Sequence, residues 1–151
     1  MPTAGQHTLH AEHNIRFLEN FYNSYNFNDW AITVSFYIAV HIIEAAIFNK
    51  KKIKIGTHTV DIEHSEQLSQ HSDILPKAGI SRHELRNIIA RENFAEIYNY
   101  LKPLYNDCQI ARYIHYSFDK IKVELLAKTC LKEIINWSNK NSATSFKINL
   151  K

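Results

Sequence analysis

The stretch DWAITVSFYIAVHIIEAAIF, residues 29–48, is the longest run of apolar side chains in the sequence. At 3.6 residues per turn it is apolar on almost every side, which is typical of a helix buried at the centre of a domain. Asp29 is a candidate N-cap, because its carboxylate can accept hydrogen bonds from the first free N–H groups of the helix. We therefore expect a central helix over residues 29–48.

One face of this predicted helix is polar. Thr33, Tyr37, His41 and Glu44 follow each other at steps of four, four and three residues, which places them on one side. Unpaired polar groups are costly to bury, so this stripe needs partners from other helices. His41 and Glu44 are either a ligand or acid/base pair, or a structural pair in which His41 is a hydrogen-bonded core histidine.

The composition favours an all-α fold in a single domain spanning residues 1–151. The chain has 45% hydrophobic residues but only three Gly and three Pro, whereas β-rich folds use many of both in turns. The two cysteines form no CxxC pair, and the first residues lack the pattern of a signal peptide, so we expect a cytoplasmic protein. His41 and Glu44 argue against residues 29–48 spanning a membrane.

Helical periodicity continues on both sides of the central stretch. We expect helices over residues 7–25, over 81–91 from a capping box of Ser81 and Glu84, and over 94–105, where Pro103 should kink the helix or force a fresh start. Asp107 is a candidate cap for a helix over 110–137, continuous or divided near Ser117. Residues 49–56 read as a helix end stopped by Gly56. Residues 58–75 read as a short helix or ordered loop, ended by Pro76 and Gly79.

These elements predict an antiparallel bundle of about five helices. Its core would span about residues 7–138, followed by a loose polar tail at 139–151.

Two charged clusters could carry chemistry. Arg112 and His115 would share a helix face, where a base and a guanidinium suit metal-independent RNA cleavage, or else form a solvated salt-bridge cluster. Arg82 and Arg86 lie one turn apart and could grip a phosphate, or Arg86 could pair with Glu44. No two histidines stand four residues apart near His58, and no glycine-rich phosphate loop is present, so we expect neither a metal nor a cofactor.

Three segments resemble one family of helical bundles, the HEPN (higher eukaryotes and prokaryotes nucleotide-binding) domains. The first is the central stretch, in which the matching residues are Asp29, Trp30, Phe36, Tyr37, Ala39, His41, Glu44 and Ala45. The second is LYNDCQIARY, residues 104–113, with Cys108 where the family usually has Ser. The third is SRHELRN, residues 81–87, which resembles the family's Ser-His-x-x-Arg segment with Arg82 inserted.

His58 is a competing match for the family's histidine, although the spacing to Arg112 favours His83. In that alignment residues 52–80 are an insertion. The catalytic members of the family carry Arg and His four to six residues apart on one helix, and no such pair occurs here. The closest is Arg112 with His115, which is shorter.

The resemblance, without the catalytic Arg and His pair, implies a small non-catalytic HEPN-like domain that binds RNA, a nucleotide or a partner protein in a defence or toxin–antitoxin setting. It also implies a homodimer and a possible antitoxin-like partner. We expect the binding residues to be His41, Glu44, His83, Arg86 and Arg112. The alternatives are a ribonuclease that uses Arg112 and His115 as catalytic residues, and a structural dimerisation module whose exposed face is drawn from Tyr98, Tyr100, Tyr105 and Tyr116.

Overall fold

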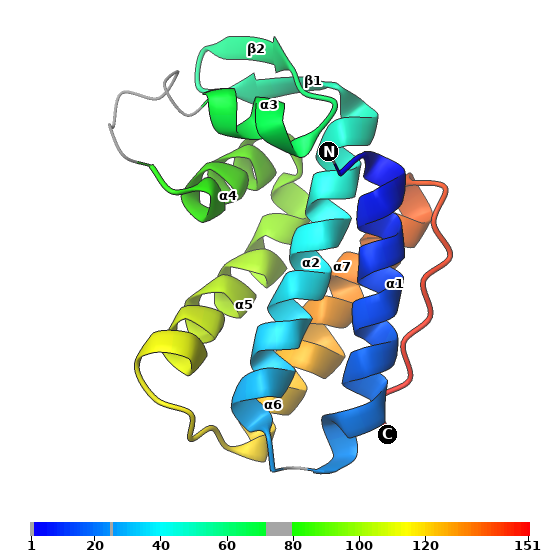
Figure 1. The fold of residues 1–151 in the computed structure, drawn as a ribbon, viewed down its shortest axis with the longest axis vertical. Coiled ribbons are helices and arrows are strands. Elements are labelled where there is room, and N and C mark those ends of the chain that lie inside the picture. The colour runs from blue at the N-terminus through cyan, green and yellow to red at the C-terminus, as the bar shows by residue number, and fades with distance from the viewer. Residues whose placement is uncertain (1, 25, 72–79) are drawn as a thin grey trace.

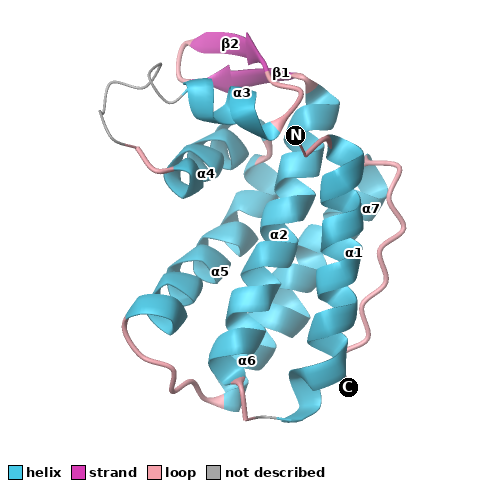
Figure 2. Ribbon diagram, in the orientation of Figure 1, coloured by secondary structure: helices cyan, strands magenta, loops and turns pink. Residues whose placement is uncertain are grey.

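A computed structural model describes residues 2–24, 26–71 and 80–151 of the chain. Four long helical segments run alternately up and down along the molecule, and a small hairpin with two further helices lies at one end (Figures 1 and 2). The expected all-α class is confirmed in that the described residues are mostly helical and form a helical bundle, but the small two-stranded sheet was not predicted. The elements are α1 (Ala4–Phe21), η1 (Tyr22–Ser24), α2 (Asn28–Lys50), β1 (Lys52–Ile55), β2 (His58–Asp61), α3 (Ser65–Gln70), α4 (Arg82–Asn93), α5 (Ala95–Tyr113), α6 (Lys120–Glu124), the π-helical η3 (Leu125–Leu131) and α7 (Lys132–Asn141).

The central helix is α2, as predicted. It packs against α1, α5 and the η3–α7 segment, and nearly all of its side chains between Ala31 and Phe48 are buried. By length and composition alone α2 could cross a membrane, but 83% of its most apolar window is buried inside the fold. That burial is what a core helix of a globular bundle shows.

The predicted cap of α2 is wrong by two residues. Phe27 occupies the N-cap position without a side-chain hydrogen bond, and Asp29 lies within the first helical turn. There its carboxylate still suits the positive end of the helix dipole. Asn28 explains part of the shift, since its side-chain amide donates to the Phe118 carbonyl (2.6 Å) and ties the start of α2 to a distant loop.

The lysine-rich segment after α2 is a β-hairpin rather than a helix end. Lys51 has a positive φ of 64° and ends α2, after which β1 and β2 pair antiparallel with Ile53 opposite Val60. Gly56 (φ 61°) makes the turn. Ile53 and Ile55 alternate with exposed lysines and are fully buried, which is the two-residue period of a strand with one buried face.

The capping box at Ser81 and Glu84 is confirmed at the start of α4. The next helix differs from the prediction, because α5 runs unbroken through Pro103 and on to Tyr113. Leu101 and Leu104 are fully buried on either side of Pro103, and we attribute the tolerance of the proline to that burial. Asp107 is therefore no cap. It is buried within α5, where Lys122 Nζ lies 3.2 Å from its carboxylate.

Helix α5 is separated from the last helical segment by residues 114–119. The division near Ser117 is confirmed, and Asp119 caps α6 by accepting a hydrogen bond from the Lys122 N–H. The predicted stop at Pro76 and Gly79, the end of the segment 58–75, and Tyr25 at the end of the first predicted helix all lie outside the described residues.

The tail at residues 139–151 is not loosely held, contrary to the prediction. Phe146 is buried, and Asn139 holds it by donating to its carbonyl (2.8 Å) and accepting from its N–H (2.9 Å). Further along, the Asn149 N–H donates to Glu19 of α1 (2.6 Å). The polar composition of the tail concealed its apolar contacts, since Phe146 is buried and Ile148 and Leu150 pack against the core.

Candidate functional site

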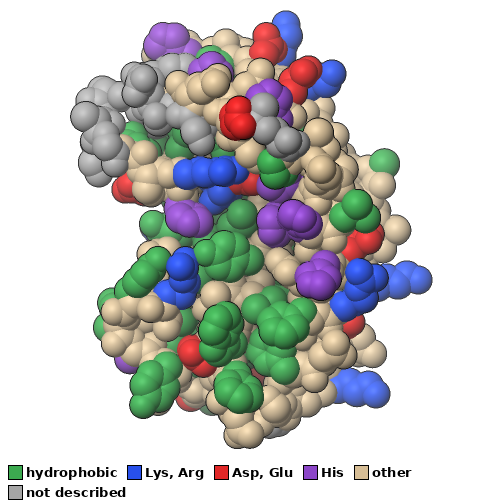
Figure 3. All heavy atoms as spheres, viewed as in Figure 1, with side chains coloured by type: hydrophobic (Ala, Val, Ile, Leu, Met, Phe, Trp, Pro, Cys, Tyr) green, Lys and Arg blue, Asp and Glu red, His purple; other side chains and the backbone are tan. Residues whose placement is uncertain are grey.

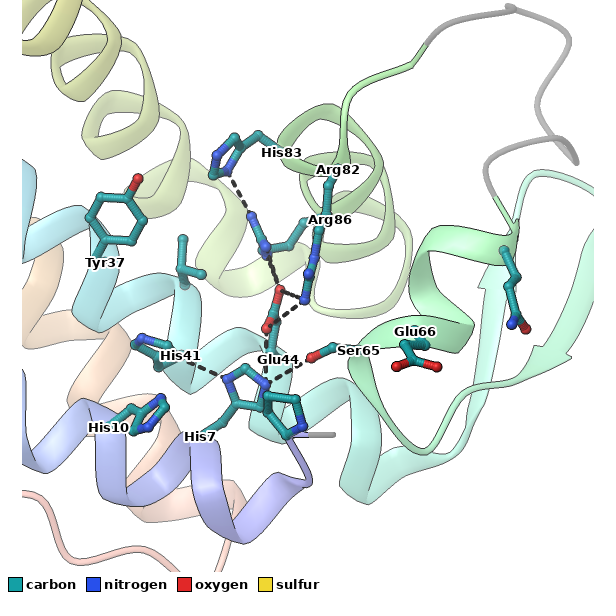
Figure 4. A pocket seen from close by; sticks show the side chains of 13 residues that line it. His7, His10, Tyr37, His41, Glu44, Ser65, Glu66, Arg82, His83 and Arg86 are labelled. Atoms are coloured by element: carbon teal, nitrogen blue, oxygen red, sulfur yellow. Dashed lines mark hydrogen bonds and ion pairs between the residues drawn. The ribbon is translucent and has the colours of Figure 1, made fainter.

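A pocket of about 760 Å³ opens between the upper ends of α1 and α2 and the elements α3 and α4 (Figure 4). Its walls are rich in histidine, arginine and glutamate. Figure 3 shows Arg, Lys and His side chains gathered on this face, with apolar side chains below them. The residues that line it are Pro2, His7, His10, Tyr37, Val40, His41, Glu44, Ser65, Glu66, Gln70, Arg82, His83 and Arg86.

Glu44 is the buried centre of this site. Its Oε1 accepts hydrogen bonds from Nε (3.0 Å) and Nη2 of Arg86, which is equally buried. Nη2 of Arg82 donates to both carboxylate oxygens, at 3.2 and 3.3 Å. The predicted choice for Arg86 is thus resolved geometrically: it pairs with Glu44, while Arg82 is shared between Glu44 and the pocket.

Two arginines on one carboxylate fix the local charge. Burial alone would raise the pKa of Glu44, but Arg86, Arg82 and His7 outweigh it and hold that pKa below its usual value. Glu44 is therefore ionised at neutral pH. It compensates Arg86, which leaves Arg82 as a surplus cation whose side chain is 42% exposed at the pocket wall.

His7 links α1 to two other elements. Its Nε2 lies 3.1 Å from Glu44 Oε2 and 3.1 Å from Ser65 Oγ, and its Nδ1 lies 2.9 Å from Nδ1 of His41. His10, one turn further along α1, sits edge-on to the His41 ring with centroids 5.1 Å apart. Three imidazoles thus share one side of the pocket.

Burial keeps His7 and His41 neutral. Desolvation lowers the pKa of His41 to about 4, with His7 and His10 acting in the same direction. Desolvation likewise lowers the pKa of His7, against the opposing effect of Glu44. At pH 7 both rings therefore act as hydrogen-bonding groups without charge.

His83 stands on the opposite side of the pocket, on α4. Nη1 of Arg86 donates to its Nδ1 (2.9 Å), and desolvation followed by Arg86 lowers its pKa. A guanidinium only donates, so neutral His83 must carry its proton on Nε2. His83 is therefore a donor held in place by Arg86. His58, the competing match, is exposed on β2 away from this pocket.

Arg112 lies in the last turn of α5, where it borders the pocket through Tyr37. Its Nη1 donates to the Tyr37 hydroxyl (2.7 Å), and its guanidinium lies over the rings of Tyr37 (5.8 Å) and Tyr113 (4.9 Å). His115 lies past the end of α5, with its ring against Phe118 (5.0 Å), and lines a different pocket. The predicted shared helix face of Arg112 and His115 is wrong because α5 ends at Tyr113.

Four of the predicted binding residues, His41, Glu44, His83 and Arg86, meet in one network of hydrogen bonds and ion pairs that passes through His7, and Arg112 lies at its margin. The sequence prediction missed His7 and Ser65, and it left Arg82 and His10 out of the binding set. The only sequence signal for α1 was the pair His7 and His10 at helical spacing. Nothing in the sequence places α1 beside Glu44.

Other chemistry finds little support in the described part of the chain. No group of three or more His, Cys, Asp or Glu residues there has the geometry to hold a metal ion. Burial raises the pKa of the Cys108 thiol to about 11, so that it stays protonated at neutral pH and is a poor nucleophile. The site is therefore best described by its hydrogen-bond donors and its surplus arginine.

Comparison with known proteins finds no matching family model, no matching curated protein and no matching solved structure. The class that fold and site define is a helical bundle with a buried Glu–Arg–His network beneath an open pocket.

Proposed function

We propose that this chain is a HEPN-like helical domain whose pocket binds the phosphate group of an RNA or a nucleotide without cleaving it. The family assignment rests on the three sequence segments, and the defence or toxin–antitoxin setting is what that resemblance implies. The observation that carries the binding function is the surplus guanidinium of Arg82, held half-exposed at the pocket wall by a carboxylate that Arg86 already compensates.

Further groups around the pocket suit an anion. Arg112, which donates to the Tyr37 hydroxyl, adds a second cation. The Nε2–H of His83 adds an uncharged hydrogen-bond donor. Glu66 is the other carboxylate among the described lining residues, and it is exposed on α3. Arginine suits phosphate because its planar N–H groups match the phosphate oxygens.

Binding by single-site variants tests this proposal. Fluorescence anisotropy with a labelled single-stranded RNA and calorimetry with a nucleoside diphosphate would be run on the parent, Arg82→Gln and Arg91→Gln. Arg91 is the matched control, because it is exposed on the same helix and does not line this pocket. We expect Arg82→Gln to weaken binding roughly 10- to 100-fold, the scale of a charged hydrogen bond, and Arg91→Gln to leave it unchanged.

Two results would contradict the proposal. One is a parent protein that binds neither probe. The other is an equal loss for Arg91→Gln, which would mean diffuse surface charge rather than a site.

A protein-interaction role is a second candidate, and a specific surface favours it. Tyr113, Ile114, Tyr116 and Ile121 are each at least two-thirds exposed around the connection between α5 and α6. Of the tyrosines predicted to form a dimer face, Tyr116 alone is exposed; the other three, Tyr98, Tyr100 and Tyr105, pack against the core. Large exposed apolar side chains gathered in one region are typical of protein interfaces.

Light scattering after size-exclusion chromatography tests this second candidate. We expect a homodimer for the parent and a monomer for Ile114→Lys combined with Ile121→Lys. A monomeric parent across the accessible concentration range would remove the candidate.

A further inference from the structure

The contacts between Glu44, His7 and His41 indicate which ring nitrogen of each histidine carries its proton. Glu44 Oε2 lies 3.1 Å from Nε2 of His7, and an ionised carboxylate at that distance favours a proton on this nitrogen over a lone pair, with Ser65 Oγ, also 3.1 Å away, accepting from the Nε2–H. Neutral His7 then has a lone pair on Nδ1. Since Nδ1 of His41 lies 2.9 Å away, His41 must donate from its own Nδ1.

This order leaves the second nitrogen of His41 as an acceptor. Neutral His41 with its proton on Nδ1 carries a lone pair on Nε2. No hydrogen bond within the described part of the chain engages that nitrogen, and His41 lines the pocket. Glu44 therefore fixes the tautomer of His7, and His7 fixes the tautomer of His41, a form of control that carboxylate–histidine pairs commonly exert.

The free Nε2 of His41 is a hydrogen-bond acceptor, whereas the groups proposed to bind the phosphate are donors. Arg82, Arg112 and the Nε2 of His83 all donate and match phosphate oxygens. Because Nε2 of His41 accepts, a ligand that uses it must carry a hydrogen-bond donor in addition to its phosphate. In a ribose phosphate, the sugar hydroxyls are donors that lie close to the phosphate, and the 2′-hydroxyl is the group that separates RNA from DNA.

We propose that Nε2 of His41 accepts a hydrogen bond from the ribose 2′-hydroxyl of the bound ligand, which makes His41 a specificity-determining residue for ribose over sugars that lack this donor. His7 is a positioning residue that holds His41 in the accepting tautomer. This inference rests on the proposed phosphate-binding function and adds the sugar that the same site selects. It applies equally to an RNA and to a free ribonucleotide.

Ligands that differ only at the 2′ position test it. The probes are a short oligouridine with 2′-hydroxyl groups and the same oligonucleotide with 2′-fluoro groups, which keep an RNA-like sugar shape but donate no hydrogen bond. UDP and its 2′-fluoro analogue form a second pair, which separates an RNA site from a nucleotide site. Calorimetry on the parent should give about 5- to 10-fold tighter binding of the hydroxyl form, the scale of one neutral hydrogen bond.

Two variants identify the residues responsible. His41→Asn keeps an amide donor near the position of Nδ1, beside His7, but removes Nε2. We expect it to bind the hydroxyl and fluoro ligands equally. His7→Gln keeps a donor toward Glu44 but removes the ring nitrogen that orients His41, so the ratio of the affinities for the hydroxyl and fluoro ligands should shrink. Thermal unfolding of each variant confirms that it is folded before it is compared.

The outcomes separate the two proposals. Equal binding of hydroxyl and fluoro ligands by the parent overturns the role of His41 while leaving phosphate binding intact. A hydroxyl preference that persists in folded His41→Asn overturns it as well. Binding of neither ligand by the parent overturns the phosphate site and this inference together.

Discussion

Glu44→Gln is the substitution that most directly tests the network beneath the pocket. The change keeps the shape of the side chain but removes the charge that compensates Arg86, which is only 4% exposed. Leaving a buried charge without its partner costs about 3–5 kcal/mol in the free energy of unfolding. In a chain of this size each kcal/mol of lost stability lowers the melting temperature by about 2–4 °C, so the variant should melt roughly 6–20 °C below the parent.

The assay is urea unfolding followed by circular dichroism at pH 7, with calorimetry for the melting temperature. Glu133→Gln is the control, because Glu133 is exposed on α7 and should change stability by less than about 0.5 kcal/mol. Combining Glu44→Gln with Arg86→Met removes both charges. That double variant should be more stable than the sum of the single losses predicts.

A loss below about 1 kcal/mol for Glu44→Gln would refute the reasoning. It would mean that water reaches Arg86, or that Arg86 finds another partner when the carboxylate is gone. An additive double variant would likewise show that Glu44 and Arg86 do not depend on each other.

Three further predictions follow from other parts of the structure. The pKa of His41 is lowered from 6.5 to about 4 in the folded protein, so between these pH values the unfolded chain binds more protons than the folded one, and the free energy of unfolding should fall by on the order of 2–3 kcal/mol as the pH drops from 6.5 to 4. Denaturant midpoints measured across this range should change less in His41→Asn than in the parent. The same dependence of the midpoint on pH in both proteins would contradict the assignment. Ser81→Ala should cost about 0.5–2 kcal/mol in unfolding experiments by removing the capping box of α4, and Ser117→Ala, in the exposed connection, should cost almost nothing. RNA incubated with the protein in EDTA should remain intact on a gel, and shortening that Arg112→Ala and His115→Ala both abolish would instead establish the ribonuclease alternative.

The parts of the fold that sequence could predict are those with a strong local signal. The apolar run of α2 and the capping box at Ser81 each carry their own pattern, and both stand where expected. Pro103 and Asp107 misled because their local preferences were overridden by packing in the middle of α5. The hairpin was missed because the three consecutive lysines suggested a helix end. The alternation of Ile53 and Ile55 with lysines indicates a strand only when the segment is tested for a two-residue period.

The residues of the candidate site likewise fall into those that the sequence could predict and those that it could not. His41 and Glu44 stand out because polar side chains in an apolar helix need partners, and that argument led to Arg86 on α4. His7 could not be found by it, since α1 is amphipathic and its histidines look like ordinary surface residues. Its contact with Glu44 spans 37 positions of sequence and depends on how α1 and α2 pack, which local periodicity does not specify.

The position of the first residues has a practical consequence. Pro2 lies on the wall of the pocket, whereas the opposite end of the chain runs back along α1 through the contact of Asn149 with Glu19 (Figure 1). An affinity tag fused ahead of Pro2 would emerge beside Arg82 and the histidines. There a polyhistidine sequence could occupy the ligand's place or introduce a metal ion of its own. Purification handles therefore belong after Lys151, and binding measured with a tag at the other end should be repeated after its removal.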